Sequence, residues 1–306
     1  MSQLNWTEAQ WNRVNSAITE EFTKASVAGA WLPCYGPVGA SMEAVSKQVF
    51  KYEDKDAIIK ISDDETTSFW TIRTFVHLNS QQVADENLSS ALFAFKRAVN
   101  LLARTEDYLV FVGHDAGAKR PPRPLPRQTN DPPNAPAMIL GVIANKEHSA
   151  DGLLTHNNVA AQSILKPFDD KKNPKHTGSD GEALVRKIAD AIAELEDKGY
   201  PGPFACVLGR NLYLEALTPV PGSMVLPADR IAPMLGGPLL RSGSMPAAHG
   251  VVASSCGESL DLVVATPPKA QFLQVNEDAK YVFRVYERFA LRIKDPVAII
   301  PINLNG

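Results

Sequence analysis

The side chains best able to do chemistry in this sequence are six histidines, three cysteines and the adjacent acidic residues Glu106 and Asp107. No two histidines have the i, i+4 spacing that places two metal ligands on one face of a helix, and no HExxH motif occurs. His148 and His156 lie near Glu147 and Asp151, which leaves a weak metal site as an alternative. Polar histidines in a loop are the interpretation that we favour, so we expect no metal site.

None of the nucleophilic residues has the neighbours that catalysis requires. The sequence has neither a GxSxG turn nor a GxxxxGK[ST] phosphate loop. No base lies close in the sequence to the run Ser254-Ser255-Cys256, so a turn that ends a strand is its simplest explanation. Glu106 and Asp107 are adjacent in a predicted helix, so their side chains point about 100° apart and make a poor acid–base pair. We therefore expect no catalytic residues and a protein that is not an enzyme.

The composition is that of a globular protein able to bury a core, because 44% of the 306 residues are hydrophobic and 21% are charged. A net charge of -3 provides no overall basic field, so we expect neither a nucleic-acid nor a membrane partner. Cys34, Cys206 and Cys256 are far apart and odd in number, which favours unpaired thiols in a reducing compartment. The N-terminus lacks a signal-peptide pattern, and no run of about 20 apolar residues occurs. These features predict a cytoplasmic protein.

Capping signals and apolar stripes indicate four helices. Thr7 and Gln10 have the spacing of a capping box, and Trp6 and Trp11 that of a hydrophobic staple, at the start of a helix that fades by Gly29. Three further helices are predicted over residues 88–112, 179–198 and 227–235.

Strands are predicted where apolar and polar residues alternate. The longest covers residues 281–293, with apolar side chains on one face and Arg284, Arg288 and Arg292 on the other. Helices and strands together predict an α+β fold. Arms and hairpins that cannot bury themselves usually find partners in neighbouring subunits, so we expect such contacts here. Shorter strands are expected over residues 57–61, 68–78, 204–208, 251–254 and 260–265.

Residues 117–137 interrupt this pattern with seven prolines interleaved with basic residues. Proline prevents a regular helix or a central strand here. An exposed loop or arm is the favoured interpretation, and a ligand for an aromatic groove is the alternative.

The order of several segments resembles the encapsulins, the linocin-like bacteriocin family. These segments are the capped first helix, Tyr35-Gly36-Pro37-Val38-Gly39-Ala40, the long helix carrying Glu106-Asp107, Gly202-Pro203-Phe204-Ala205-Cys206-Val207-Leu208, Phe283-Arg284-Val285-Tyr286-Glu287 and Leu291-Arg292-Ile293-Lys294-Asp295-Pro296. The resemblance covers nearly the whole chain except about residues 117–178.

The resemblance implies the tailed-bacteriophage major capsid protein fold (HK-97 type) with an N-terminal helix, an extended loop, a peripheral domain and an axial domain. It also implies a self-assembling icosahedral nanocompartment that encloses a cargo enzyme, a peroxidase or a ferritin-like protein, docked through a C-terminal targeting peptide. The domains would be 1–47 (N-terminal helix and arm), 48–78 (extended loop), 79–178 (peripheral domain with the insertion 117–137), 179–259 (axial domain) and 260–306 (return to the peripheral domain).

Two functional sites are implied by the same resemblance. The cargo peptide would lie in an apolar groove between the first helix and a late segment of the chain, and the fivefold pore would be lined by one loop of the axial domain. Ordinary core packing remains an equal alternative for the groove residues. The groove residues are Phe22, Ser26, Gly29, Trp31, Leu32, Ala270 and Phe272. The pore-loop residues are Thr218, Pro219, Val220, Pro221, Gly222 and Ser223.

The sequence departs from the family pattern at three positions besides the proline-rich insertion. Gly29 and Pro33 stand where many members have an arginine and an aspartate, so a charged clamp on the cargo peptide is not expected. Gln81 stands where some members have a flavin-stacking tryptophan, so we predict no flavin and no other cofactor.

Two alternatives to a cargo-enclosing shell remain open. The first is a phage or prophage major capsid protein of the same fold. The second is a secreted bacteriocin or protease, against which the missing signal peptide and the absence of a catalytic constellation argue.

Overall fold

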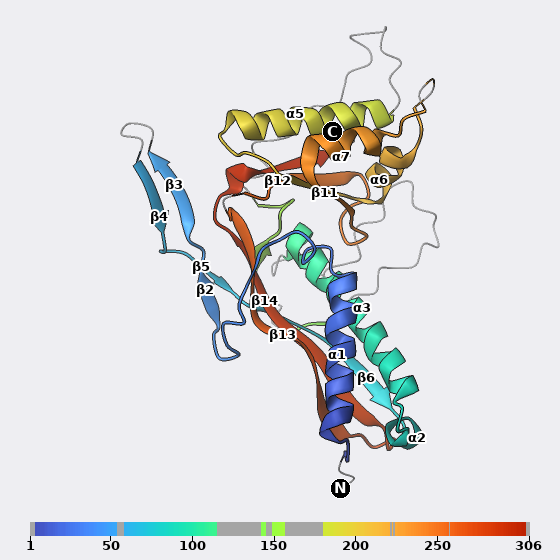
Figure 1. Cartoon of the computed structure of the whole chain (residues 1–306). Coiled ribbons are helices and arrows are strands. Elements are labelled where there is room, and N and C mark those ends of the chain that lie inside the picture. Colours follow the sequence, from blue (N-terminus) through green and yellow to red (C-terminus); the bar gives the residue numbers. More distant parts are fainter. Residues whose placement is uncertain are drawn as a thin grey trace.

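The computed structural model describes residues 4–53, 58–114, 142–144, 149–156, 180–220, 222, 224–256 and 258–303. Two sheets organise these residues: a five-stranded sheet of order β1-β13-β14-β6-β8 and a four-stranded sheet of order β11-β10-β12-β15. We call the five-stranded sheet with its helices the larger unit and the four-stranded sheet with its helices the smaller unit. Figure 1 shows the smaller unit above the larger one, with a long hairpin projecting to one side. The α+β prediction is confirmed.

The larger unit is built on two long antiparallel strands. They pair from Leu260 opposite Ile293 to Val275 opposite Tyr281. The third strand, β6, pairs antiparallel with β14 along the whole length of β6, and short strands pair at both edges of the sheet. The strands are β13 (Leu260–Val275), β14 (Tyr281–Ile293), β6 (Trp70–Leu78), β1 (Cys34–Tyr35) and β8 (Val142–Ile143).

The first helix, α1 (Glu8–Ala25), begins as its sequence predicts. The Thr7 side chain accepts a hydrogen bond from the Gln10 backbone, and the Gln10 side chain accepts one from the Thr7 backbone. The rings of Trp6 and Trp11 pack edge to face with their centroids 5.1 Å apart. The capping box and the aromatic pair fix where the helix starts and how the chain enters it.

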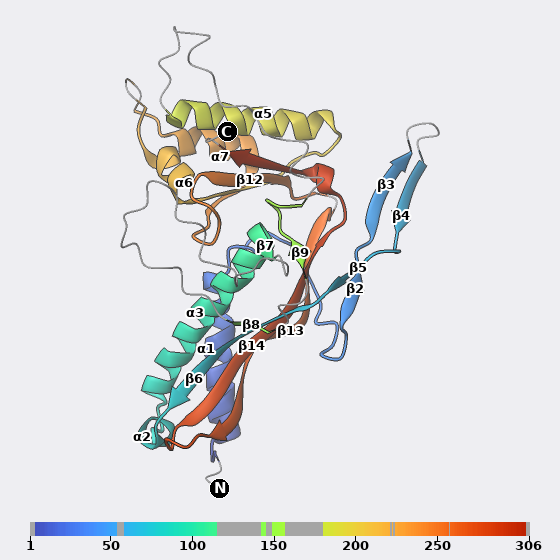
Figure 2. The same cartoon turned by 180° about the vertical axis from the view of Figure 1, so that it is seen from behind.

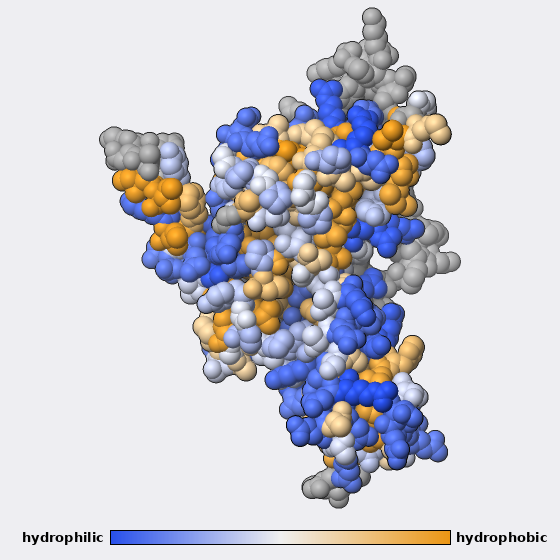
Figure 3. Space-filling model, viewed as in Figure 1, coloured by the Kyte–Doolittle hydropathy of each residue, from blue (hydrophilic) through white to orange (hydrophobic). Residues whose placement is uncertain are grey.

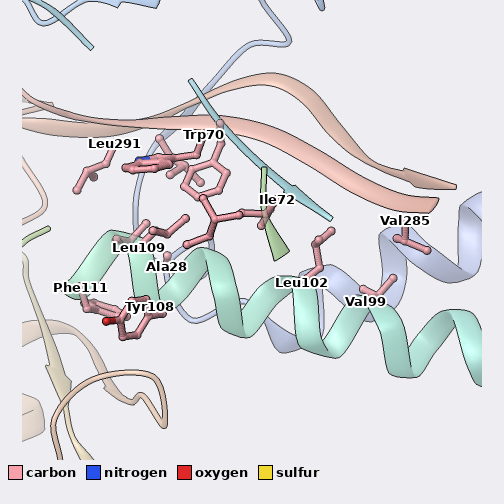
Figure 4. Close-up of a cluster of buried hydrophobic side chains, with 14 of the residues drawn as sticks. Ala28, Trp70, Ile72, Val99, Leu102, Tyr108, Leu109, Phe111, Val285 and Leu291 are labelled. Atoms are coloured by element: carbon pink, nitrogen blue, oxygen red, sulfur yellow. The ribbon is translucent and has the colours of Figure 1, made fainter. Parts of the chain in front are cut away.

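A long helix, α3 (Ser89–Val112), covers the same sheet, preceded by the short α2 (Ser80–Ala84). α1 contacts both α3 and β13, and α3 contacts β6 and β14, so in Figures 1 and 2 the two helices lie along the sheet. Figure 4 shows the buried apolar side chains between α3 and the strands. α3 ends at Gly113, whose φ of +77° favours glycine. A Cβ there would also lie 2.5 Å from the Ala150 carbonyl oxygen, because β7 (Gly113–His114) pairs with β9 (Ala150–Asp151).

Strand β14 has the predicted alternation, with two differences. Glu287 occupies a position on the apolar face and is 1% exposed. Arg292, on the other face, is also buried, because its guanidinium forms a bidentate pair with the buried Asp261. The period-2 pattern therefore predicted the strand and its faces, but it did not show that charged residues are buried on both faces.

The smaller unit packs three helices on its sheet. All five residues of β10 are buried, as expected for the central part of a sheet covered by helices. Its elements are α5 (Asp180–Asp197), β10 (Phe204–Leu208), α6 (Arg210–Leu217), α7 (Pro227–Leu235), β11 (Gly236–Arg241), β12 (His249–Ser254) and, after the 3-10 helix η1 (Pro296–Ala298), β15 (Ile299–Asn303). These bounds confirm the predicted elements over 204–208, 227–235 and 251–254.

The projecting hairpin carries apolar side chains that its own chain leaves exposed. Ile59 and Ile61 are 65% and 66% exposed, and Tyr52 is 56% exposed. Figure 3 shows hydrophobic surface on the outer part of the hairpin. The hairpin consists of β2 (Ala44–Ser46), β3 (Val49–Glu53), β4 (Ile58–Ser62) and β5 (Thr66–Ser68), which pair β2 with β5 and β3 with β4.

Two of the expected segment bounds need correction. The extended loop was expected over 48–78, but β6 is a strand of the five-stranded sheet, so the projecting part ends before Trp70. Residues 260–306 were expected to return to the peripheral domain, but β15 pairs with β12 in the smaller unit. Long-range strand pairing decides both bounds, and local patterns do not report it. The proline-rich segment 117–137 lies outside the described residues.

Candidate functional site

Ser254 and Cys256, which resembled part of a nucleophile turn, bind backbone carbonyl groups. Ser254 Oγ donates a hydrogen bond to the Pro201 carbonyl at 2.8 Å. Cys256 Sγ lies 3.1 Å from the Gly202 carbonyl oxygen. These contacts hold the turn between β12 and β13, as the sequence analysis expected. The three cysteines are free thiols.

No metal centre is formed by the part of the chain that the structure describes, since no group of three or more His, Cys, Asp or Glu side chains converges there. His156 lies half-buried, and burial lowers its pKa. Glu147 and His148, the other members of the weak alternative site, lie outside the described residues. Gln81 is exposed on α2.

The residues predicted for cargo docking lie on adjoining elements, because α1 contacts β13. Five of them border the surface, and we call them the α1–β13 strip. Gly29 is exposed, and the other four side chains are partly buried and pack against the core of the larger unit. The strip consists of Phe22, Gly29, Trp31, Ala270 and Phe272.

The other two predicted residues do not reach the surface. Ser26 is 5% exposed and Leu32 is 4% exposed. Ser26 Oγ donates to Glu106 Oε1 at 2.6 Å and accepts from the Gly29 backbone N–H at 2.8 Å. Neither side chain is therefore accessible to a peptide in the isolated subunit, and their part in a docking groove stays a prediction.

The strip is elongated and does not form one compact pocket. The Phe272 ring lies 5.4 Å from that of Phe283, which stacks 5.0 Å from Trp6, so Phe272 lies beside the start of α1. Phe22 lies eleven residues beyond Trp11, which corresponds to about 16 Å along a helix. An extended ligand suits this geometry better than a globular one.

An aromatic cluster anchors the start of α1 to the sheet and was missed as a unit by the sequence analysis. Its rings are 5.0–6.3 Å apart between centroids. Five members stand on the apolar face of their own helix or strand, and Trp6 was found only as half of the hydrophobic staple with Trp11. The cluster consists of Trp6, Trp11, Phe95, Phe272, Tyr281 and Phe283.

Three buried carboxyl groups lie where the end of α1 meets α3 and β14. Glu106, Asp107 and Glu287 are between 0% and 2% exposed. Asp107 Oδ1 accepts the backbone N–H groups of Val27 at 3.0 Å and Ala28 at 2.8 Å. The two adjacent acids on α3 thus point to different partners, as predicted.

Burial shifts the titration of this cluster. Desolvation raises the pKa of Glu106 to about 7 and raises those of Asp107 and Glu287 well above the ordinary values. The charge of Glu106 further raises the pKa of its two neighbours. The sequence analysis considered Glu106 and Asp107 but missed Glu287. The signal that could have found it is an acidic residue at an apolar-face position of an alternating strand.

The predicted pore loop joins α6 to α7 and is exposed over much of its length. Thr218 ends α6, and its Oγ donates to the Leu214 carbonyl at 2.8 Å. Pro219 and Gly222 are exposed, and Val220 is half-buried. Met224 follows fully exposed. Pro221 and Ser223 lie outside the described residues.

Comparison with known proteins connects this geometry to a family. A family model described as "Encapsulating protein for peroxidase" (Linocin_M18) matches residues 2–120 and 156–290. The type 1 encapsulin shell protein EncA of Myxococcus xanthus is 26% identical over 98% of this chain and 94% of its own length. A diheme-cytochrome-encapsulin shell fusion protein of Kuenenia stuttgartiensis is 22% identical over 97% of this chain and 74% of its own length.

Solved structures share the fold. A virus-like particle from Pyrococcus furiosus has a TM-score of 0.65 and 17% identity, covering 97% of this chain and 100% of that chain. The capsid of Myoviridae phage XM1 has a TM-score of 0.53 and 14% identity, covering 89% of each chain. The HK-97-type capsid fold expected from the sequence is confirmed. No helix among the described residues is both long and apolar enough to cross a membrane. Because the family model spans most of the chain and shell proteins match along its length, this chain belongs to the encapsulin family as a self-assembling shell subunit with a capsid-like fold.

Proposed function

We propose that shells of this subunit enclose a cargo protein, which docks on the inner surface through an extended apolar C-terminal peptide laid along the α1–β13 strip. The observation that carries the proposal is the packing of α1 beside β13, which lines up half-buried apolar side chains along about 16 Å. An extended peptide advances about 3.3 Å per residue, so roughly five residues would span this distance. Several copies of the strip per shell would strengthen the docking of an oligomeric cargo.

The proposed cargo is a peroxidase or a ferritin-like protein. The description of the family model names a peroxidase, which supports the first of these. Gly29 and Pro33 stand where an ion-pairing clamp would be needed. The affinity would therefore come from burial of apolar surface, at about 25 cal/mol per Å².

The subunit's own role in this proposal is structural and not catalytic. Selectivity would reside in the exposed loop after α6, which we propose as the fivefold pore loop, and in the size of the closed shell. We propose that the shell is a nanocompartment in the cytoplasm, which remains a prediction from the composition of the sequence.

Assembly would use the projecting hairpin. Its exposed Tyr52, Ile59 and Ile61 would be covered by a neighbouring copy of the chain, since isolated exposed apolar strands of this kind are rare in proteins that act alone. The partner proposed here is a second copy of the same subunit.

The docking proposal is tested with Trp31→Glu, which places a carboxylate on the strip just after the end of α1. The variant should form intact shells, because Trp31 is half-buried near the surface. The amount of cargo that co-purifies with these shells should fall by a factor of about ten or more. The measurement is the cargo-to-shell ratio by quantitative mass spectrometry of native particles, with particle integrity checked by electron microscopy.

The matched control is Phe75→Glu, which introduces the same charge at a 43% exposed aromatic residue on the opposite face of the sheet. It should load cargo like the wild type. Equal loading of Trp31→Glu and wild-type shells, with both intact, would move the docking site away from this strip.

A further inference from the structure

The junction between α1, α3 and β14 buries more acidic groups than it has obvious counter-charges. Ser26, Glu106, Asp107 and Glu287 are all at most 5% exposed. Burying ionised carboxylates without a paired cation is strongly unfavourable. A cluster of this kind is stable only if protons or hydrogen-bond donors neutralise it.

The hydrogen-bond pattern shows which part of the cluster lacks donors. Glu106 Oε1 accepts from Ser26, and Asp107 accepts from the backbone of the segment that follows α1. Glu106 Oε2 and Glu287 Oε2, in contrast, have no donor among the described residues when both groups are ionised. One proton on Glu287 supplies the missing donor to Glu106.

The other ionisable groups around the cluster do not neutralise it. On α3, Arg104 is a cation that favours the charged form of Asp107. Cys34 on β1 raises the pKa of Glu287 further. Asp261 on β13 raises the pKa of Cys34, so neither residue supplies a positive charge to the cluster. Among these neighbours the groups that act on Glu287 all oppose its ionisation.

We propose that Glu106 and Glu287 share one proton, and that this proton holds the end of α1 and residues 26–32 against α3 and β14 as a pH-sensitive latch. Loss of the shared proton places two negative charges side by side in the interior. Opening of the segment then exposes both groups to water and relieves the repulsion. The latch lies directly below the α1–β13 strip, but its action does not depend on whether the proposed cargo docking is correct.

The sign of the pH dependence follows from linkage. A carboxyl group whose pKa is raised in the closed state, here Glu106 at about 7 and Glu287 above its ordinary value, favours the closed state at low pH. That preference is lost as the pH rises from the ordinary carboxyl value through the raised one. Each proton released on opening increases the opening equilibrium up to about tenfold per pH unit.

The test is amide hydrogen exchange of intact wild-type shells from about pH 6 to about pH 9, analysed by mass spectrometry for peptides covering residues 22–32. After correction for the pH dependence of intrinsic exchange, opening of this segment should increase with pH. Peptides of α5 in the same samples, where the helix is buried without a carboxyl cluster at its core, should show no such trend.

Glu287→Gln keeps the shape of the side chain and donates a hydrogen bond to Glu106 at every pH. The increase of the opening equilibrium with pH should therefore be smaller than in the wild type, by up to tenfold for each pH unit. Ser26→Ala removes a donor to the ionised Glu106 and also the acceptor of the Gly29 backbone N–H, so opening should exceed the wild type at every pH, and by a larger factor at alkaline pH than near pH 6. Glu196→Gln, an exposed position on α5, is the control and should behave like the wild type. A pH-independent wild-type segment, or equal pH slopes in the wild type and Glu287→Gln, would overturn the proposal.

Discussion

The buried ion pair between β13 and β14 offers a quantitative test of how this fold is held together. Arg292 Nε and Nη2 lie 2.8 and 2.6 Å from the two Asp261 carboxylate oxygens, and Lys294 Nζ lies 2.9 Å from Oδ2. The side chains of Asp261 and Arg292 are only 6% and 7% exposed. One buried carboxylate therefore pairs with two cations, and Lys294 Nζ also lies 3.8 Å from Glu258 Oε2.

Asp261→Leu should be costly, because it leaves the buried Arg292 guanidinium without its carboxylate and beside the Lys294 ammonium, which keeps only Glu258 at 3.8 Å. Breaking a buried pair in this way costs about 3–5 kcal/mol. At about 2.1 cal/mol/K of unfolding entropy per residue, this loss lowers the Tm of the 306-residue chain by about 5–8 °C. Arg292→Leu should cost less, since Asp261 retains Lys294 as a partner. The double variant should be more stable than Asp261→Leu alone.

The assay is thermal unfolding of intact shells, followed by tryptophan fluorescence at one protein concentration. Glu182→Ala is the matched control, since it removes the carboxylate of an ion pair whose side chains are 44% and 45% exposed. Exposed pairs contribute about 0–1 kcal/mol, so its Tm should change by less than about 2 °C. The reasoning would be refuted if Asp261→Leu lowered the Tm no more than Glu182→Ala does. It would also be refuted if the double variant were no more stable than Asp261→Leu alone.

The remaining predictions concern the core and the hairpin. Phe283→Ala removes a fully buried ring at the centre of the aromatic cluster and should destabilise the subunit by about 3–5 kcal/mol, measured as a lower Tm, whereas Phe93→Ala, at a 76% exposed ring, should change it little. Combined Ile59→Asp and Ile61→Asp should leave a folded subunit that no longer forms shells, seen as a small species in size-exclusion chromatography with unchanged circular dichroism. Intact shells in that double variant would show that the hairpin face does not support assembly.

Local signals in the sequence predicted the elements well. The capping box of Thr7 and Gln10 and the alternation of β14 correspond to physical rules that act within a few residues. The ordered family segments predicted the capsid fold and the shell role, which the family model and the shared fold confirm. The order of the segments indicates the fold because related proteins keep their helices and strands in the same order along the chain.

Long-range pairing and burial were not available from the sequence. The return of β15 to β12 and the place of β6 in the central sheet depend on contacts between distant segments. The docking strip remains a prediction, though the structure decides that Ser26 and Leu32 lie beneath it.

The sequence by itself determined where four of the helices and several strands begin and which of their faces are apolar, and it contains no motif for a catalytic centre. Only the tertiary structure decided that Glu106, Asp107 and Glu287 meet in the interior. The physical reason is that α3 and β14 are far apart in the sequence, and local patterns do not report which distant elements pack together. The charge state of these carboxyl groups, and with it the proposed latch, depends on the elements that pack against them.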